Sequence, residues 1–422
     1  MRPAWNGRRR SVDHEQLQRP RLDFLHGLRG VLALTVVLFH LVAGLGIDRS
    51  RPAIALLMAP IMHGHLAVPA FLVLSGFLLA MPVVLHGGQL PGGLFDFLRR
   101  RAIRILSPYY AAYFLSMAFF LAVERGLALY GIAPWRKLTR MVARDSTIPS
   151  VVSHLFLVHN LDGKWAAGMT GVFWTIACEW QIYLLFALVL VPVWHRYGLW
   201  TAVALCVAIA AVLTELCARD IIFYQFPWLI PVFASGMVAA VLAFGSAPLC
   251  RSMRKANWGA ITAGLVVILC IVVWRLDATV LAKDGTRWVA VPYNHFPLRI
   301  RWIPDVLAGI CVASGIVWLA VGHPSVAAAS SRTGPVASRV CGILESRWLL
   351  SLGLCGYSLY LTHLQWIVLL KWTTQALALP PAPRLATLLA LGIPGSLVIA
   401  WLFHRWFERP FMTRSTREMF RP

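Results

Sequence analysis

The chain has 422 residues, of which 59% are hydrophobic and 13% are charged. Soluble globular proteins are about half apolar and about a quarter charged, so this composition excludes an ordinary soluble enzyme and indicates a protein embedded in a lipid bilayer. The net charge of +22 does not indicate a nucleic-acid partner, because the arginines stand mostly beside apolar runs, where the positive-inside rule and anionic headgroups place them.

Apolar runs of about 20 residues, the length that spans a bilayer, recur along the chain. They predict an all-α membrane protein, a polytopic bundle of about ten transmembrane helices with no separate soluble domain. Pro60, Pro69 and Pro82 predict a kink or break in the second helix, and an alternative start for that helix lies nearer Ile54. The predicted helices are 24–45, 63–85, 107–123, 172–194, 199–217, 226–244, 258–275, 302–320, 348–370 and 385–404.

Two segments between the predicted helices need their own interpretation. In the loop 124–171, the semi-apolar stretch from Val151 to Leu161 predicts a segment that lies in the membrane interface or re-enters the membrane. The segment 322–340 is rich in Ser, Ala and Gly, which predicts a flexible cytoplasmic linker.

The distribution of positive charge predicts the orientation of the chain. An even number of helices places both termini on one side, and arginine is abundant in the N-terminal tail, in the loop after the second helix and near the C-terminus. The positive-inside rule therefore predicts a multi-pass protein of the cell inner membrane with both termini in the cytoplasm. On this interpretation, residues 1–20 and 413–422 are cytoplasmic tails of the transmembrane domain 21–412.

The eight cysteines show no Cys-x-x-Cys spacing and do not cluster with histidine. Those inside apolar runs are interpreted as small hydrophobic side chains in helix packing. We therefore expect neither a metal site nor a bound cofactor.

Charged groups inside membrane helices are costly, so they usually have a partner or a function. The first helix carries Arg29 near its inner end and His40 in its outer third, on nearly the same face and about 16 Å apart along the axis. Glu179 of the fourth helix and His363 of the ninth lie at the same predicted depth as His40. A carboxylate beside an imidazole raises its basicity, so we expect His40 to act as a general base oriented by Glu179 or another polar partner. The alternatives are a snorkelling Arg29 and a His40 that serves only a helix contact.

Arg101 and Arg104 stand three residues apart just before Ser107-Pro108-Tyr109-Tyr110, so both side chains can point the same way from a helix. Guanidinium groups bind phosphate through paired hydrogen bonds, although topogenic charge alone is an alternative explanation. With His40, these arginines predict a channel that binds phosphate at its inner mouth and carries a base in its outer third. Coenzyme A, with an anionic nucleotide and a long thin arm, fits that shape.

Six short motifs follow one another along residues 20–412. They are Arg21-Leu22-Asp23-Phe24-Leu25-His26-Gly27-Leu28-Arg29-Gly30 with His40, Phe71-Leu72-Val73-Leu74-Ser75-Gly76-Phe77-Leu78-Leu79, Arg101 and Arg104 with Pro108 and Tyr110, Phe173-Trp174-Thr175 with Glu179 and Tyr183, Tyr357-Ser358-Leu359-Tyr360-Leu361-Thr362-His363, and Glu408-Arg409-Pro410-Phe411. In this order and spacing they resemble the motifs of the membrane-bound acyltransferase 3 family. The opening motif differs from the family pattern at Phe24, Leu25 and His26, but the spacing from Arg29 to His40 is intact.

The resemblance implies a membrane enzyme that transfers acetyl or other short acyl groups from acyl-CoA. It implies that His40 is catalytic and that Arg29, Arg101 and Arg104 serve donor binding or structure. The implied acceptors are surface polysaccharides, lipid-linked sugars, peptidoglycan, and secreted macrolides or other small molecules.

We therefore expect an O-acyltransferase in which Arg29, Arg101 and Arg104 hold the phosphates of cytosolic acyl-CoA, the co-substrate. His40 takes the proton from a hydroxyl of a glycan, glycolipid or secreted small molecule, and Ser75, Tyr360 and His363 are candidate substrate contacts that stabilise the oxyanion. A covalent acyl-histidine route is a variant. The alternative function is a proton-coupled transporter or flippase, in which the buried His and Glu side chains relay protons. The remaining expected partner is the lipid bilayer.

Overall fold

The computed structural model describes residues 22–43, 45, 58, 60–132, 142–166, 168, 170–284, 298–323 and 334–412. Within these residues the regular structure is helical and contains no strand, which confirms the all-α class. Eight helices of the described chain are long and apolar enough to cross a membrane. Both predicted tails (1–20 and 413–422) and the alternative helix start near Ile54 lie outside the described residues.

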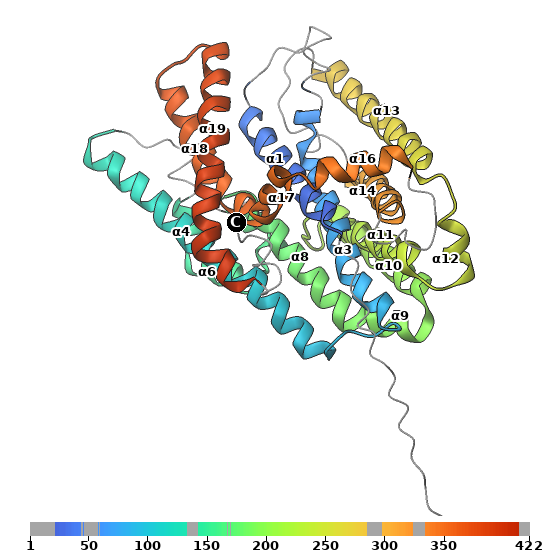
Figure 1. Ribbon diagram of the computed structural model, residues 1–422. Coiled ribbons are helices and arrows are strands. Elements are labelled where there is room, and N and C mark those ends of the chain that lie inside the picture. The colour runs from blue at the N-terminus through green and yellow to red at the C-terminus, as the bar shows by residue number, and fades with distance from the viewer. Residues whose placement is uncertain are drawn as a thin grey trace, which may run out of the picture.

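All ten apolar runs that were predicted to be helical form helices (Figure 1). The long elements are α1 (Phe24–Val42), α3 (Ala67–Leu85), α4 (Gly93–Leu129), α8 (Phe173–Leu185) continued by η3 (Phe186–Leu190) and α9 (Val191–Tyr197), α10 (Leu199–Ala218), α11 (Leu229–Phe244), α13 (Trp258–Asp284), α14 (Leu298–Val321), α18 (Gly356–Ala376) and α19 (Pro381–Phe403). The short elements are η1 (Gly64–Leu66), α6 (Ile148–Leu155), η2 (His159–Leu161), α7 (Gly163–Ala166), α12 (Pro248–Met253), α16 (Pro335–Leu344), α17 (Arg347–Leu354), η5 (His404–Glu408) and η6 (Arg409–Phe411).

Three boundaries differ from the sequence predictions. α4 begins at Gly93 rather than at residue 107, because its arginine-rich first turns continue the helix although they are not apolar. The second predicted helix starts with the 3₁₀ turn η1, and α3 then runs through Pro82 without a break. The linker predicted for 322–340 is wrong where α16 forms, since Pro335 at its first turn is compatible with a helix start and Ala337 and Cys341 are buried. Residues 324–333 of that segment lie outside the described chain.

α6 buries its polar side and exposes its apolar side. Ser150 and His154 are buried, whereas Ile148 and the following Phe156 are 79% and 71% exposed. Surface helices of soluble proteins do the reverse, so this face suits contact with lipid. The hydroxyl of Tyr110 on α4 anchors the segment by donating to the carbonyl of Leu155 at 2.6 Å. The interfacial location of 151–161 stays a prediction, which this arrangement favours.

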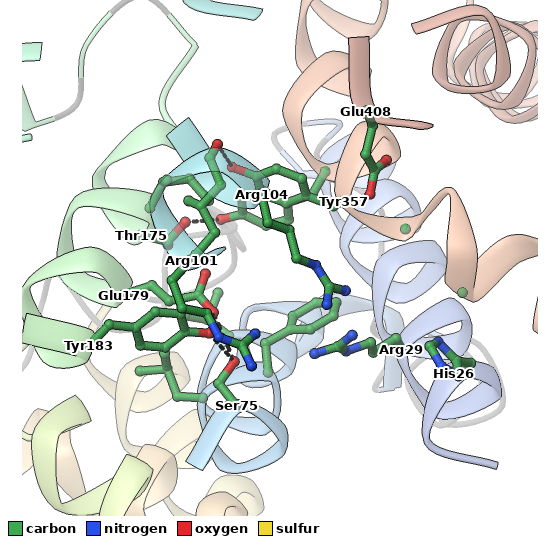
Figure 2. Close-up of a pocket in the computed structure, with 18 of the residues that line it drawn as sticks. His26, Arg29, Ser75, Arg101, Arg104, Thr175, Glu179, Tyr183, Tyr357 and Glu408 are labelled. Carbon is green, nitrogen blue, oxygen red and sulfur yellow. Dashed lines mark hydrogen bonds between the residues drawn. The ribbon is translucent and has the colours of Figure 1, made fainter. Parts of the chain in front are cut away.

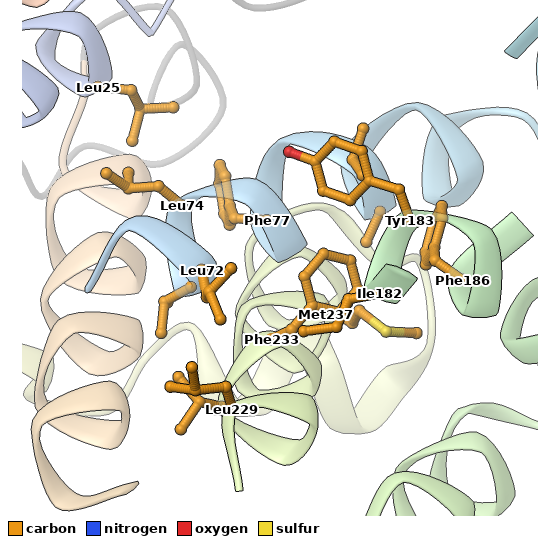
Figure 3. Close-up of a cluster of buried hydrophobic side chains, with 14 of the residues drawn as sticks. Leu25, Leu72, Leu74, Phe77, Ile182, Tyr183, Phe186, Leu229, Phe233 and Met237 are labelled. Atoms are coloured by element: carbon orange, nitrogen blue, oxygen red, sulfur yellow. The ribbon is translucent and has the colours of Figure 1, made fainter. Parts of the chain in front are cut away.

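The centre of the bundle is the crossing of α3 and α11, where the two backbones approach closely. A Cβ atom at Gly76 would overlap the carbonyl oxygen of Phe233, and one at Gly236 would overlap the carbonyl oxygen of Val73. Small residues at a membrane helix crossing allow this approach. The surrounding apolar cluster, which includes Leu72 and Phe77 from α3, Ile182, Tyr183 and Phe186 from the α8 segment, and Leu229, Phe233 and Met237 from α11, fixes the helices that form one side of the site (Figure 3).

We expect Gly236→Ala to destabilise the protein by about 1–3 kcal/mol or more, because the added methyl group must push two packed backbones apart. The matched control is Gly264→Ala on α13, where an added Cβ meets no atom within 4 Å. Thermal unfolding in detergent or nanodiscs measures both variants. Equal melting temperatures for the two would contradict the close crossing.

Candidate active site

A cavity lies among α1, α3, α4, α8, α11 and α18 (Figure 2). The cavity has a volume of about 120 Å³. One water molecule needs about 10–15 Å³ by the same measure, so the cavity has room for several. Its lining combines guanidinium groups, hydroxyl and carboxylate groups, and apolar side chains. Arg101 lies beside Tyr183 and Ser75 (Figure 2), and the apolar lining residues of α3 and α8 precede Ser75 and Glu179 by one or two turns. The lining residues are His26, Arg29, Val68, Phe71, Leu72, Ser75, Arg101, Arg104, Ile105, Thr175, Ile176, Glu179, Tyr183, Leu229, Gly353, Leu354, Gly356, Tyr357, Tyr360, Glu408 and Met412.

Three guanidinium groups meet at the basic end. Arg29 comes from α1, Arg101 and Arg104 come from α4, and all three side chains reach into the cavity (Figure 2). Within the described residues, none of them forms an ion pair with a carboxylate, and Arg101 makes a cation–π contact with the ring of Phe97 at 5.9 Å. Cations that share a partly buried cavity without a carboxylate partner favour the binding of an anion. The sequence prediction that these arginines act together agrees with this arrangement.

The carboxylate of Glu179 is held by two hydroxyl groups. Ser75 donates to its Oε1 at 2.8 Å, and Tyr183 donates to the same oxygen at 2.5 Å. The hydroxyl groups of Tyr183 and Ser75 are themselves 3.0 Å apart. In the described part of the chain no hydrogen bond joins Glu179 to His40, so the expectation that this carboxylate orients the base is not met. A shared depth did not fix the rotation of α8, which turns Glu179 towards α3 and the cavity.

The partner of His40 is His363. Nε2 of His363 lies 3.2 Å from Nδ1 of His40, and the ring centroids are 5.1 Å apart. The sequence placed these two histidines at one depth without predicting contact, and the structure brings them together.

The hydrogen bonds assign the tautomers of this pair. Nδ1 of His363 lies 2.9 Å from the carbonyl of Leu359 and must donate to it, so Nε2 of a neutral His363 is an acceptor. Nδ1 of His40 lies 2.9 Å from the carbonyl of Val36 and therefore carries the proton, which it shares with His363. Nε2 of His40 then holds a lone pair, as a general base requires.

Tyr360 stands between the cavity and the histidine pair. Its ring centroid is 6.0 Å from that of His363 and 6.2 Å from that of Phe71. Its hydroxyl shares a hydrogen bond with Oγ1 of Thr175 at 2.7 Å and donates to the carbonyl of Val172 at 3.3 Å. Tyr360 lines the cavity, whereas His40 and His363 lie behind it. The cavity thus extends from the arginines to within one aromatic ring of the histidine pair.

Glu408 is a lining residue that the sequence indicated only as an anchor of the last helix. Ser358 donates to its Oε2 at 2.5 Å and Nδ1 of His404 donates to the same atom at 2.9 Å, so its carboxylate is engaged away from the arginines. Tyr183 was also missed as a site residue. The signal for both was present in the four-residue spacings of His404 to Glu408 and Glu179 to Tyr183, which place each pair on one helix face.

A family model described as an acyltransferase domain (acyltransferase 3) matches residues 22–405 of the chain. The chain therefore belongs to this acyltransferase family. No curated protein and no solved structure gives a significant match.

We expect the basic end to bind polyphosphate. Inorganic pyrophosphate should raise the melting temperature of the purified protein, and Arg104→Gln should weaken its binding about tenfold or more, because a charge-assisted hydrogen bond is worth about 1.5–3 kcal/mol. The matched control is Arg100→Gln, since Arg100 lies on the same helix but points outward and pairs with Asp96. Titration calorimetry measures the affinities. Equal loss in both variants would show that binding depends on general surface charge.

Proposed function

We propose that this membrane acyltransferase is an O-acyltransferase that moves an acyl group, in the first place acetyl, from cytosolic acyl-CoA to a hydroxyl of a carbohydrate-like or secreted small-molecule acceptor. One observation carries the proposal. A single cavity has three guanidinium groups without carboxylate partners at one end and stops one ring short of a histidine pair at the other.

The basic end supports acyl-CoA as the donor. Its phosphates would lie against Arg29, Arg101 and Arg104, and its pantetheine arm would pass Ser75 and Glu179 towards Tyr360. Guanidinium groups suit this ligand because they match phosphate oxygens through paired hydrogen bonds. Arg29 lies near the N-terminal end of α1, so a cytoplasmic N-terminus in the inner membrane would open this end towards the cytosolic donor pool.

The histidine pair supports base catalysis. Nε2 of His40 takes the proton of the acceptor hydroxyl as the oxygen attacks the carbonyl carbon of the thioester. The carbon–sulfur bond then breaks, the proton passes from the imidazolium to the departing thiolate, and the products are the ester and free coenzyme A. His363 positions His40 through the shared proton on Nδ1. The hydroxyl of Tyr360 is a candidate donor to the developing oxyanion, provided that it leaves the carbonyl of Val172, to which it donates in the resting protein.

We expect His40→Ala to lower kcat by about 10²–10⁴-fold, the usual contribution of a general base, and to leave the Kd for acetyl-CoA unchanged. His363→Ala should lower kcat less, and His363→Gln should restore part of the loss because the amide oxygen can accept the proton on Nδ1 of His40. Release of coenzyme A from labelled acetyl-CoA gives kcat, and equilibrium binding gives Kd.

Normal turnover by His40→Ala would reject His40 as the base. Labelled acetyl-CoA that stays intact with the wild-type protein under all conditions would instead favour the alternative, a proton-coupled transporter or flippase in which the histidines relay protons.

A further inference from the structure

One end of the cavity is built from apolar side chains that precede Ser75 on α3 and Glu179 on α8 by one or two turns, together with one from α11. Tyr183, which follows Glu179 by one turn, lies beside Arg101 instead (Figure 2). Val68, Phe71 and Leu72 come from α3, Ile176 comes from α8 and Leu229 comes from α11. Leu72, Ile176 and Leu229 are at most 4% exposed, so this wall is part of the packed interior. It offers dispersion and hydrophobic contact to whatever occupies it.

Two aromatic rings close this apolar end. Phe71 and Tyr360 meet edge to face, with centroids 6.2 Å apart and planes at 72°. Tyr360 is tethered through its hydroxyl to Thr175 and to the carbonyl of Val172. Phe71 is half-buried and packs against both the main apolar core and the smaller core formed by α1, α18 and α19. The ring of Phe71 is therefore the part of the closure that is held by packing alone.

We infer that this apolar end is the subsite for the acyl group and that Phe71 limits the length of the acyl chain. The inference rests on the proposed function, because it takes acyl-CoA as the molecule whose phosphates lie on the arginines. A donor anchored at the basic end directs its thioester to the other end of the same cavity. There the apolar walls hold the acyl chain, and Tyr360 separates the carbonyl from the histidine pair by one ring.

The combination of guanidinium groups and apolar side chains in one cavity favours an acyl donor over other molecules with an apolar part. A lipid tail or an apolar acceptor would also be held by Val68, Leu72 and Leu229, but neither needs guanidinium groups at the opposite end. An acyl thioester of a polyphosphate has both properties in one molecule, with the anion and the apolar group at its two ends. Tyr360 lies 6.0 Å from His363, centroid to centroid, so a carbonyl at this end is separated from the histidine pair by that one ring.

The test measures the donor chain-length profile of the full chain in nanodiscs, with water as the acceptor. Release of coenzyme A from acetyl-, propionyl-, butyryl- and hexanoyl-CoA gives kcat/KM for each donor. Phe71→Ala should raise the ratio of kcat/KM for butyryl-CoA to that for acetyl-CoA at least about tenfold, because one methylene that gains or loses its place in an apolar pocket changes specificity by about 10–200-fold. Val68→Phe should lower the same ratio.

Leu74→Ala is the matched control. Leu74 lies on the same helix and is fully buried, but it does not line the cavity. Its loss should lower stability and leave the ratio unchanged, because a ratio of two donors measured on one preparation does not depend on the folded fraction.

The outcomes separate the two levels of the proposal. A ratio that stays within about threefold of wild type in both Phe71→Ala and Val68→Phe, while the wild type turns over acetyl-CoA, overturns the acyl subsite and leaves the proposed function standing. A changed KM for an added acceptor with an unchanged donor ratio assigns the apolar end to the acceptor and also overturns the inference. A wild-type protein that neither binds nor cleaves any acyl-CoA overturns the proposed function, and the subsite falls with it.

Discussion

Three positive charges meet in one partly buried cavity, and the carboxylates that share the cavity are committed elsewhere. Glu179 accepts from Ser75 and Tyr183, and Glu408 accepts from Ser358 and His404. Each of these hydrogen bonds lowers the capacity of a carboxylate to neutralise the arginines by direct contact. The two carboxylates still offset part of the repulsion among the guanidinium groups through space. The packing of the bundle holds the helices together against the remainder until an anion enters.

The helix that carries both Arg29 and His40 is fixed at its two ends. At the start of α1, the backbone N–H of Phe24 donates to Oε1 of Glu345 at 3.2 Å. At its end, Nζ of Lys371 on α18 donates to the carbonyl of Ala43 at 2.5 Å. Between these points α1 packs closely on α16 and α17. A Cβ atom at Gly27 would overlap the carbonyl oxygen of Leu344, and one at Gly353 would overlap the carbonyl oxygen of His26. The distance between Arg29 and His40 is thus set by one helix that is anchored at both ends.

The sequence predicted the features that depend on one helix at a time. Apolar length identified every long helix of the described chain. The positions of His40 and His363 within their helices placed them at one depth, although their contact was not predicted. The predicted pairing of Glu179 with His40 was wrong, because the depth of a residue does not determine how its helix is rotated about its axis. Glu179 instead accepts hydrogen bonds from Ser75 on α3 and from Tyr183. The predicted start of α4 at residue 107 was too late, because the prediction followed apolar residues and the first turns of this helix are charged. Glu408 was missed as a lining residue because its spacing from His404 indicates only that the two side chains can pair, whereas its place in the cavity depends on where α19 and η5 dock.

Tyr360 and Phe71 form the wall between the cavity and the histidine pair. For the reaction to occur, this wall must exclude water and must also open far enough for the thioester to reach His40. Tyr360 is tied to Thr175 and Val172 and keeps its place, whereas Phe71 beside it is held by packing only. Side chains held only by dispersion can change rotamer more readily than side chains held by two hydrogen bonds as well. The opening that lets a thioester reach His40 should therefore come from the Phe71 side of the wall. The hydroxyl of Tyr360 holds its ring in place through Thr175 and Val172, and it must leave these partners before its one proton can be donated to an oxyanion.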